Sequence, residues 1–260
     1  MNYQMSFLPE RTARPREKGL TMVMDKGLAL REAEDMIQIS GEYIDLVKLG
    51  FGTSMITPRL KEKVKLYQEA GMKTYFGGTM FEAFVIRGAF DEYRKYLDLY
   101  GMEYAEVSDG SIVLPHEEKL EYIRRLSGQV TVLSEVGSKT SDVPVPDSVW
   151  VGYMKSELEA GSWKVIGEAR ESGTIGLYHK DGSVNRSLID DIIEHVDIDD
   201  VIWEAPVKSQ QAWFIKLLGA NVNLGNINPK EVIALEALRV GLRGDTFYRF
   251  LPDEMKIKKD

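Results

Sequence analysis

Short apolar runs alternate along the chain with longer amphipathic runs. The short runs are rich in β-branched and aromatic residues, and eight of them begin near Leu20, Tyr43, Lys73, Glu103, Val130, Trp163, Val201 and Ala220. Several are almost continuously apolar, which is typical of parallel strands that are buried on both faces. We therefore interpret the eight runs as the strands of one parallel sheet.

The amphipathic runs between these strands have the spacing of helices that bury one face. They cover residues 28–40, 57–70, 91–100, 116–126, 147–160, 187–195, 209–218 and 229–240. Eight strand–helix units predict the α/β class and a closed (β/α)₈ TIM barrel, formed by residues 1–260 as a single domain. An open doubly wound sheet is the alternative, but eight regular units without a second domain favour the barrel.

The ends of the chain and two internal loops have no strand or helix pattern. We expect a flexible N-terminal arm over about residues 1–18 and a C-terminal tail over about residues 253–260. The loops at 136–148 and 170–185 follow the fifth and sixth strands, so both would lie at the mouth of the barrel. They are either lids over an active site or ordinary surface loops.

Composition narrows the partners and cofactors. The net charge of −8 makes nucleic acid and anionic membranes poor partners. The chain has no cysteine and three histidines, so a metal would be held by oxygen ligands, which suits Mg²⁺ or Mn²⁺. No apolar run reaches the roughly 20 residues of a membrane span, and no signal peptide is recognisable at the N-terminus. We expect a cytoplasmic protein.

Acidic side chains stand at the ends of four predicted strands. In a barrel, side chains at these positions face the active site. Carboxylates that converge there repel each other unless a cation lies between them, so they predict a Mg²⁺ site. The alternative is that they pair with Lys26, Lys48 or Arg170 and bind no metal. The four candidates are Asp109, Glu135, Glu168 and Glu204.

Basic and small polar residues at the same mouth indicate an anionic substrate, although ion pairing within the barrel would also explain the charges. The basic group comprises Lys26, Lys48, Lys139, Arg170 and Lys208. The loops after strands seven and eight often bind phosphate in barrels. There the candidate substrate-binding residues, beside Lys208, are Ser209, Gln210, Asn223, Gly225 and Asn226. The GFGTS segment at 50–54 is a further possible anion nest.

Strings at almost every strand end resemble one known family, the phosphosulfolactate synthases. They occur in the family's order over roughly residues 14–247 and read GLTMVMDKGL, VKLGFGTS, GGTMFE, EVSDGS, EVG, EARESG, EAPVKSQQ, VNLGNI and LEALRVGLRGDTF. One departure is Ala169 in EARESG, where the family often has glycine, and we expect no functional consequence from it. A match of this length is far more specific than any single motif.

The resemblance implies a (β/α)₈ barrel that adds sulfite to phosphoenolpyruvate with Mg²⁺, giving (2R)-phospho-3-sulfolactate, a step of coenzyme M or sulfolactate biosynthesis. It also implies a homo-oligomer, with a trimer as one option. The family's proposed general acid is a lysine after the EVG string, which corresponds to Lys139. We expect Lys26 and Arg170 to assist it, and Lys48 to bind the anionic substrate.

Two other functions remain open from the sequence. Some relatives in this family are associated with heat stress and have no clear catalytic role, so the chain could act through protein partners. Lys139, Glu135 and Glu168 argue against that hypothesis, because a non-catalytic barrel has no need of them. The third possibility is a Schiff-base aldolase that uses a deprotonated Lys26 or Lys48.

Overall fold

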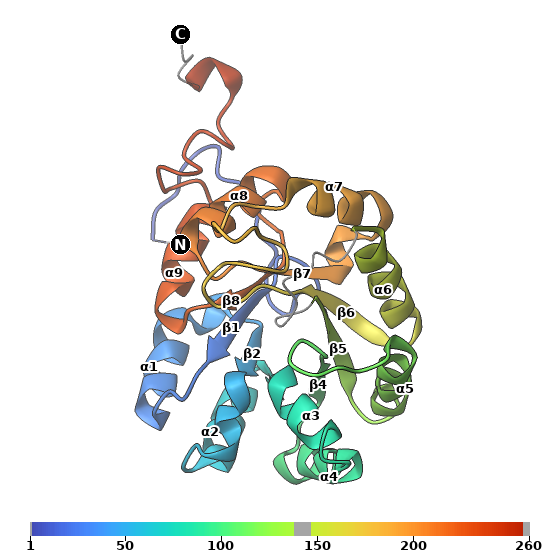
Figure 1. Cartoon of the computed structure of the whole chain (residues 1–260). Helices are drawn as coiled ribbons and strands as arrows, with labels where there is room; N and C mark the ends of the chain where they lie inside the picture. The colour runs from blue at the N-terminus through green and yellow to red at the C-terminus, as the bar shows by residue number, and fades with distance from the viewer. Residues whose placement is uncertain (1, 138–146, 257–260) are drawn as a thin grey trace.

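The computed structural model describes residues 2–137 and 147–256, and its strands form one barrel surrounded by helices (Figure 1). All eight predicted strands are present. They are β1 (Thr21–Asp25), β2 (Leu46–Leu49), β3 (Lys73–Phe76), β4 (Tyr104–Val107), β5 (Thr131–Val136), β6 (Ser162–Gly167), β7 (Val201–Glu204) and β8 (Leu224–Ile227). Each predicted start lies within four residues of the observed one, because the apolar runs coincide with the buried strands.

The strands pair in parallel in the order β3-β2-β1-β8-β7-β6-β5-β4, so the sheet curls until its edges β3 and β4 face each other. Strands β3 and β4 are joined by a side-chain hydrogen bond instead of a backbone ladder. The amide of Gly78, just after β3, donates to Glu106 Oε1 of β4 at 2.6 Å. The prediction of a single (β/α)₈ barrel is confirmed, and the open doubly wound sheet is wrong.

The helices cover the outside of the barrel. They are α1 (Leu30–Ser40), α2 (Leu60–Glu69), α3 (Gly78–Val85), α4 (Phe90–Tyr100), α5 (His116–Ser127), α6 (Asp147–Glu159), α7 (Arg186–His195), α8 (Lys208–Leu218) and α9 (Val232–Arg239). The sequence analysis missed α3, whose apolar GTMFEAFV stretch follows a double glycine without a polar face. In the described part of the chain, no helix is long and apolar enough to cross a membrane.

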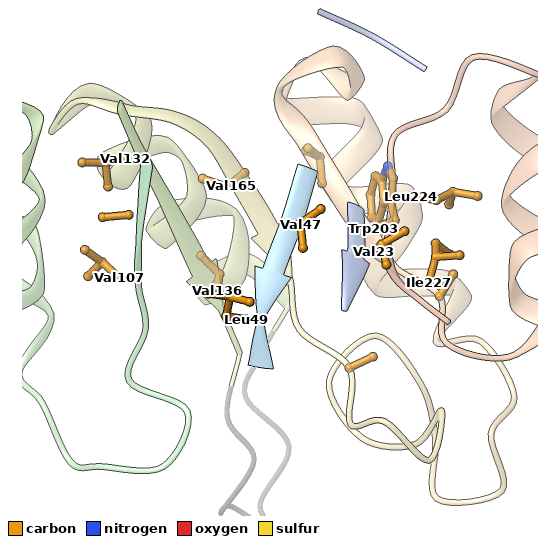
Figure 2. Close-up of a cluster of buried hydrophobic side chains, with 14 of the residues drawn as sticks. Val23, Val47, Leu49, Val107, Val132, Val136, Val165, Trp203, Leu224 and Ile227 are labelled. Carbon is orange, nitrogen blue, oxygen red and sulfur yellow. The ribbon is translucent and has the colours of Figure 1, made fainter. Parts of the chain in front are cut away.

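Two apolar cores separate the layers. The larger core lies between the strands and the helices, and Figure 2 shows strand side chains of this core, among them Val47, Val165 and Trp203. The smaller core fills the inside of the barrel. Its buried members are Leu20, Met22, Leu46, Tyr75, Leu133, Ile166 and Ile202. Because strand side chains alternate between the two faces, β1, β2, β3, β5, β6 and β7 contribute buried side chains to both cores.

The same alternation builds a polar layer above the inner core. Leu46, Leu133, Ile166 and Ile202 face the inside, and the residue two positions further along each strand faces inside as well. Those four residues are Lys48, Glu135, Glu168 and Glu204, and all four are buried. The apolar layer is therefore the floor of a charged site at the carboxyl ends of the strands.

The opposite end of the barrel is closed by arginines. Arg239 of α9 is fully buried and donates to the carbonyls of Leu20, Ala220 and Val222. Part of the N-terminal arm also binds there: Arg11 pairs with Glu236 at 2.8 Å, and Arg16 pairs with Asp45 at 2.9 Å. Flexibility of the arm stays a prediction, but from Arg11 onward it contacts the barrel.

Two buried lysines on the outer helices bind residues at the carboxyl ends of β1 and β5 from the helix side of the barrel. Lys63 of α2 binds Asp25 at the end of β1, with 2.8 Å between Nζ and Oδ2. Lys119 of α5 binds Asp109 and Glu157, each at 2.8 Å, and donates to the carbonyl of Glu135 at 2.6 Å. Since Glu135 is part of the charged layer, Lys119 fixes the backbone that supports the site.

We predict that Lys119→Met destabilises the fold by about 3–5 kcal/mol, because the buried carboxylate of Glu157 loses its counterion. Burial raises the pKa of Glu157 even with Lys119 nearby. Without the lysine the pKa of Glu157 rises further, so the folded protein takes up a proton that the unfolded chain does not hold. The free energy of unfolding therefore falls as the pH rises from the unfolded-state pKa of Glu157 toward its folded-state pKa. Urea unfolding at about pH 5.5 and pH 8 should therefore show the larger loss at the higher pH.

The matched control is Lys155→Met on the exposed face of α6, which should stay within about 0.5 kcal/mol of wild type. An equal effect of the two substitutions would contradict the role assigned to Lys119.

Candidate active site

The centre of the site is the ammonium group of Lys48, which comes from β2. Its Nζ lies 2.9 Å from Glu106 Oε1, 3.0 Å from Glu135 Oε2 and 3.3 Å from Glu204 Oε1. Three protons of one ammonium group thus meet three carboxylates. The carboxylates come from β4, β5 and β7, so the lysine joins strands on opposite sides of the barrel.

The protonation state of Lys48 follows from these neighbours. Burial alone would lower its pKa, but the charges of Glu106, Glu135 and Glu204 together raise it well above the usual value. Lys48 therefore stays a cation throughout the physiological pH range. A buried cation beside the reacting atoms can stabilise negative charge that develops on a substrate.

Three carboxylates at the mouth also form a group that could hold a metal ion. Glu135, Glu168 and Glu204 each offer one oxygen, and these oxygens lie within 4.8 Å of one another. Ligand oxygens of one octahedral Mg²⁺ site lie about 3–4.2 Å apart, so the three carboxylates would draw closer together around a bound ion. The all-oxygen, anionic donor set fits Mg²⁺ or Mn²⁺.

A small cavity opens above Lys48 and is lined by residues from seven of the eight strands or the loops that follow them. They are Met24, Lys48, Phe51, Gly77, Thr79, Glu106, Ala169, Glu171, Glu204 and Asn226. Below it lies the hydroxyl of Tyr75, which is buried and has no hydrogen-bond partner among the described residues. Burial and the charge of Glu106 raise the pKa of Tyr75 well above its usual value, so the hydroxyl keeps its proton.

The structure brings together five of the residues that the sequence selected. Lys48, Glu135, Glu168, Glu204 and Asn226 lie in or beside the charged layer.

Two further selected residues, Lys26 and Arg170, are exposed at the rim, where Lys26 pairs with Glu171. Lys139 lies outside the described residues, as does most of the 136–148 loop.

Asp109 is separate from the three-carboxylate group. It binds Lys119 instead, which lies behind β5, because the chain turns outward after β4. Its proposed role as a metal ligand is therefore not supported by position. The carboxylate that β4 contributes to the charged layer is Glu106, three residues earlier and inside the strand, where it pairs with Lys48.

The residues selected in the loop after β7 point elsewhere. Lys208 pairs with Asp245 at 3.1 Å, and Ser209 is exposed in the first turn of α8. Gln210 is buried and donates from Nε2 to the carbonyl of Gly173 at 2.8 Å, so it anchors the 170–185 loop. Substrate binding by Lys208 and Ser209 stays a prediction.

Two selections on β8 need correction. Asn223 precedes the strand and lies at the opposite end of the barrel, where its Oδ1 accepts from the amide of Leu20 at 3.0 Å. Gly225 lies inside the barrel, and a Cβ there would come within 2.6 Å of Met22 Cε. Asn223 thus stabilises the barrel base, and Gly225 makes room for Met22.

The 170–185 loop is packed onto the barrel. Leu177 is fully buried, and the hydroxyl of Tyr178 donates to the carbonyl of Glu204 at 2.6 Å. A bridge between Tyr178 and Val184 closes the loop on itself. Its packing shows an anchored loop rather than an open lid, while closure by the 136–148 loop stays a prediction.

Sequence reasoning missed Glu106 and Tyr75. The signal for both was the two-residue alternation inside the strands, since Glu106 follows Tyr104 as Glu135 follows Leu133. On β4, the rule of taking polar residues at strand ends selected Asp109, which lies beyond the strand, instead of Glu106 within it.

Comparisons with known proteins identify one family. A family model described as (2R)-phospho-3-sulfolactate synthase matches residues 9–245. The phosphosulfolactate synthase of Bacillus subtilis (strain 168) is 44% identical over 244 residues, covering 93% of this chain and 97% of that protein. That of Methanocaldococcus jannaschii is 45% identical over 239 residues, covering 89% and 94%.

A more distant relative is protein HEAT-STRESS-ASSOCIATED 32 of Arabidopsis thaliana, 22% identical over 261 residues and covering 88% of each chain. Its identity to this chain is about half that of the two synthases. The match across residues 9–245 and the two relatives above 40% identity show that this chain belongs to the (2R)-phospho-3-sulfolactate synthase family.

Proposed function

We propose that the protein is a phosphosulfolactate synthase, a lyase that adds sulfite to phosphoenolpyruvate to give (2R)-phospho-3-sulfolactate. Its membership of the family supports this reaction, and the observation that carries it is the buried cation Lys48 at the mouth of the barrel. Lys48 and a divalent cation held by the surrounding carboxylates would together supply the positive charge that a small, highly anionic substrate needs.

The reaction needs stabilisation of a carbanion. The sulfur of sulfite bonds to the methylene carbon, and the electron pair of the double bond moves toward C2 and the carboxylate. A proton then adds to C2. We propose that Lys48 stabilises the negative charge on the carboxylate, because its own carboxylate neighbours keep it protonated.

For the proton, we propose the ammonium group of Lys139, on the loop that follows β5. Strand β5 ends at Val136, and Gly137, which follows it, lies against the side chain of Glu168. Lys26 and Arg170 at the rim are proposed to guide the anions inward.

We further propose that Glu135, Glu168 and Glu204 hold Mg²⁺. Bound there, the ion would act as a Lewis acid toward the substrate carboxylate. The support is the convergence of three buried oxygens at the carboxyl ends of β5, β6 and β7.

The competing functions fit the site less well. A Schiff base requires a neutral amine, and the raised pKa of Lys48 opposes that. Lys26 is exposed and paired with Glu171, so it does not lie in the buried apolar pocket of a Schiff-base lysine. The heat-stress alternative does not explain a buried lysine with three carboxylates, whose desolvation is costly unless it serves a site.

A cytoplasmic location and a homo-oligomer, a trimer included, stay predictions.

Incubation with phosphoenolpyruvate, sulfite and Mg²⁺ should yield phosphosulfolactate, which phosphorus NMR and mass spectrometry detect. Lys139→Ala should lower kcat by about 10²–10⁴-fold with little change in KM, because it removes the general acid and keeps the anion site. Lys155→Ala on exposed α6 is the matched control. Wild-type protein that forms no product at any Mg²⁺ concentration would refute the proposed reaction.

Glu168→Gln should raise the Mg²⁺ concentration for half-maximal activity by about 10–100-fold, because it removes one anionic ligand at constant volume. Glu159→Gln, at the exposed end of α6, should leave that concentration unchanged. The assay is product formation over a Mg²⁺ titration after dialysis against chelator. An unchanged Mg²⁺ dependence in Glu168→Gln would remove this residue from the metal site.

A further inference from the structure

Asn226 on β8 has an unusual backbone. Its φ is 56°, in the left-handed region that costs a non-glycine residue free energy. The other non-glycine residues with positive φ in the described ranges are at least partly exposed, whereas Asn226 is buried. A strained and buried residue at a mouth indicates a functional constraint.

The strain arises from a bulge in β8. Thr21 of β1 pairs with Leu224, but Val23 pairs with Ile227, so β8 has one residue more than its neighbour over this stretch. Leu224 and Ile227 both belong to the outer core. Simple alternation would turn Asn226 outward with Leu224, and the bulge turns it into the cavity instead.

The orientation of the Asn226 amide follows from its neighbour. Its Nδ2 donates to the carbonyl of Ala169, an atom that can only accept, at 3.4 Å. The amide of Ala169 in turn donates to Glu204 Oε2 at 2.8 Å. The backbone of one residue, Ala169, therefore positions both the Glu204 carboxylate and Asn226.

The other branch of the amide, Oδ1, is buried and has no hydrogen-bond partner among the described residues. Lys48 lines the same cavity, but three carboxylates already surround its three protons. Phosphoenolpyruvate and sulfite offer acceptor oxygens and few or no donors, so they are poor partners for a carbonyl oxygen. A cation satisfies such an oxygen, as amide carbonyls do in sites for hard cations.

We propose that Asn226 Oδ1 is a neutral oxygen ligand of the divalent cation held by Glu135, Glu168 and Glu204. This inference rests on the metal part of the proposed function. It assigns Asn226 to the cation rather than to the phosphate. It also explains the bulge in β8, because the extra residue turns a carbonyl oxygen into the cavity that Glu204 lines.

The test is Mn²⁺ binding to chelator-treated protein without substrate, followed by electron paramagnetic resonance, with Mg²⁺ as competitor. Asn226→Gly removes the oxygen and also relieves the left-handed backbone. The metal-free variant should melt at the same temperature as wild type or higher, and it should bind Mn²⁺ about tenfold or more weakly.

Arg59→Gly is the matched control, because Arg59 also has a left-handed φ of 55° but lies at the exposed start of α2. It should keep wild-type Mn²⁺ affinity. If Asn226→Gly binds Mn²⁺ as wild type does and only its KM for phosphoenolpyruvate rises, Asn226 is a substrate ligand and this inference is wrong. If wild type itself binds no Mn²⁺, both the metal site and this assignment fail, whereas product formation tests the reaction separately.

Discussion

The burial of Lys48 among carboxylates is the interaction on which the site depends. A lone ammonium inside a barrel would lose its hydration without compensation, and the carboxylates would repel each other without it. Each stabilises the other only if β2, β4, β5 and β7 stand at the right height and spacing. The charged site therefore forms only when the barrel closes with these strands in place.

The surrounding structure holds these strands in register. The inner apolar core sets a floor one layer below the charges, and buried helix lysines fix the strand ends from behind. At β3 and β4, where no ladder forms, Glu106 serves twice: it accepts from the amide of Gly78 and pairs with Lys48. One side chain thus closes the barrel and completes the site.

The site divides into parts with different chemistry. Lys48 supplies a permanent positive charge, the group of Glu135, Glu168 and Glu204 suits a divalent cation, and the exposed Lys26 and Arg170 stand at the entrance. The proposed reaction would use this division, because it would have to stabilise negative charge and hold anionic groups at neighbouring atoms. The raised pKa of the buried lysine suits an electrostatic role better than a nucleophilic one.

The sequence by itself determined the barrel and most of its charged layer. Apolar runs alternating with amphipathic runs specify eight strands and their helices, and strand-end position selected Lys48, Glu135, Glu168 and Glu204.

Tertiary structure decided the rest. Asp109 and Glu106 lie three residues apart, and only the direction of the chain after β4 shows that one faces Lys119 and the other Lys48. Asn226 faces the cavity because pairing with β1 forces a bulge, and Asn223 closes the base because β8 begins after it. A local pattern fixes which residues alternate, whereas register and strand ends depend on neighbouring strands that are distant in sequence.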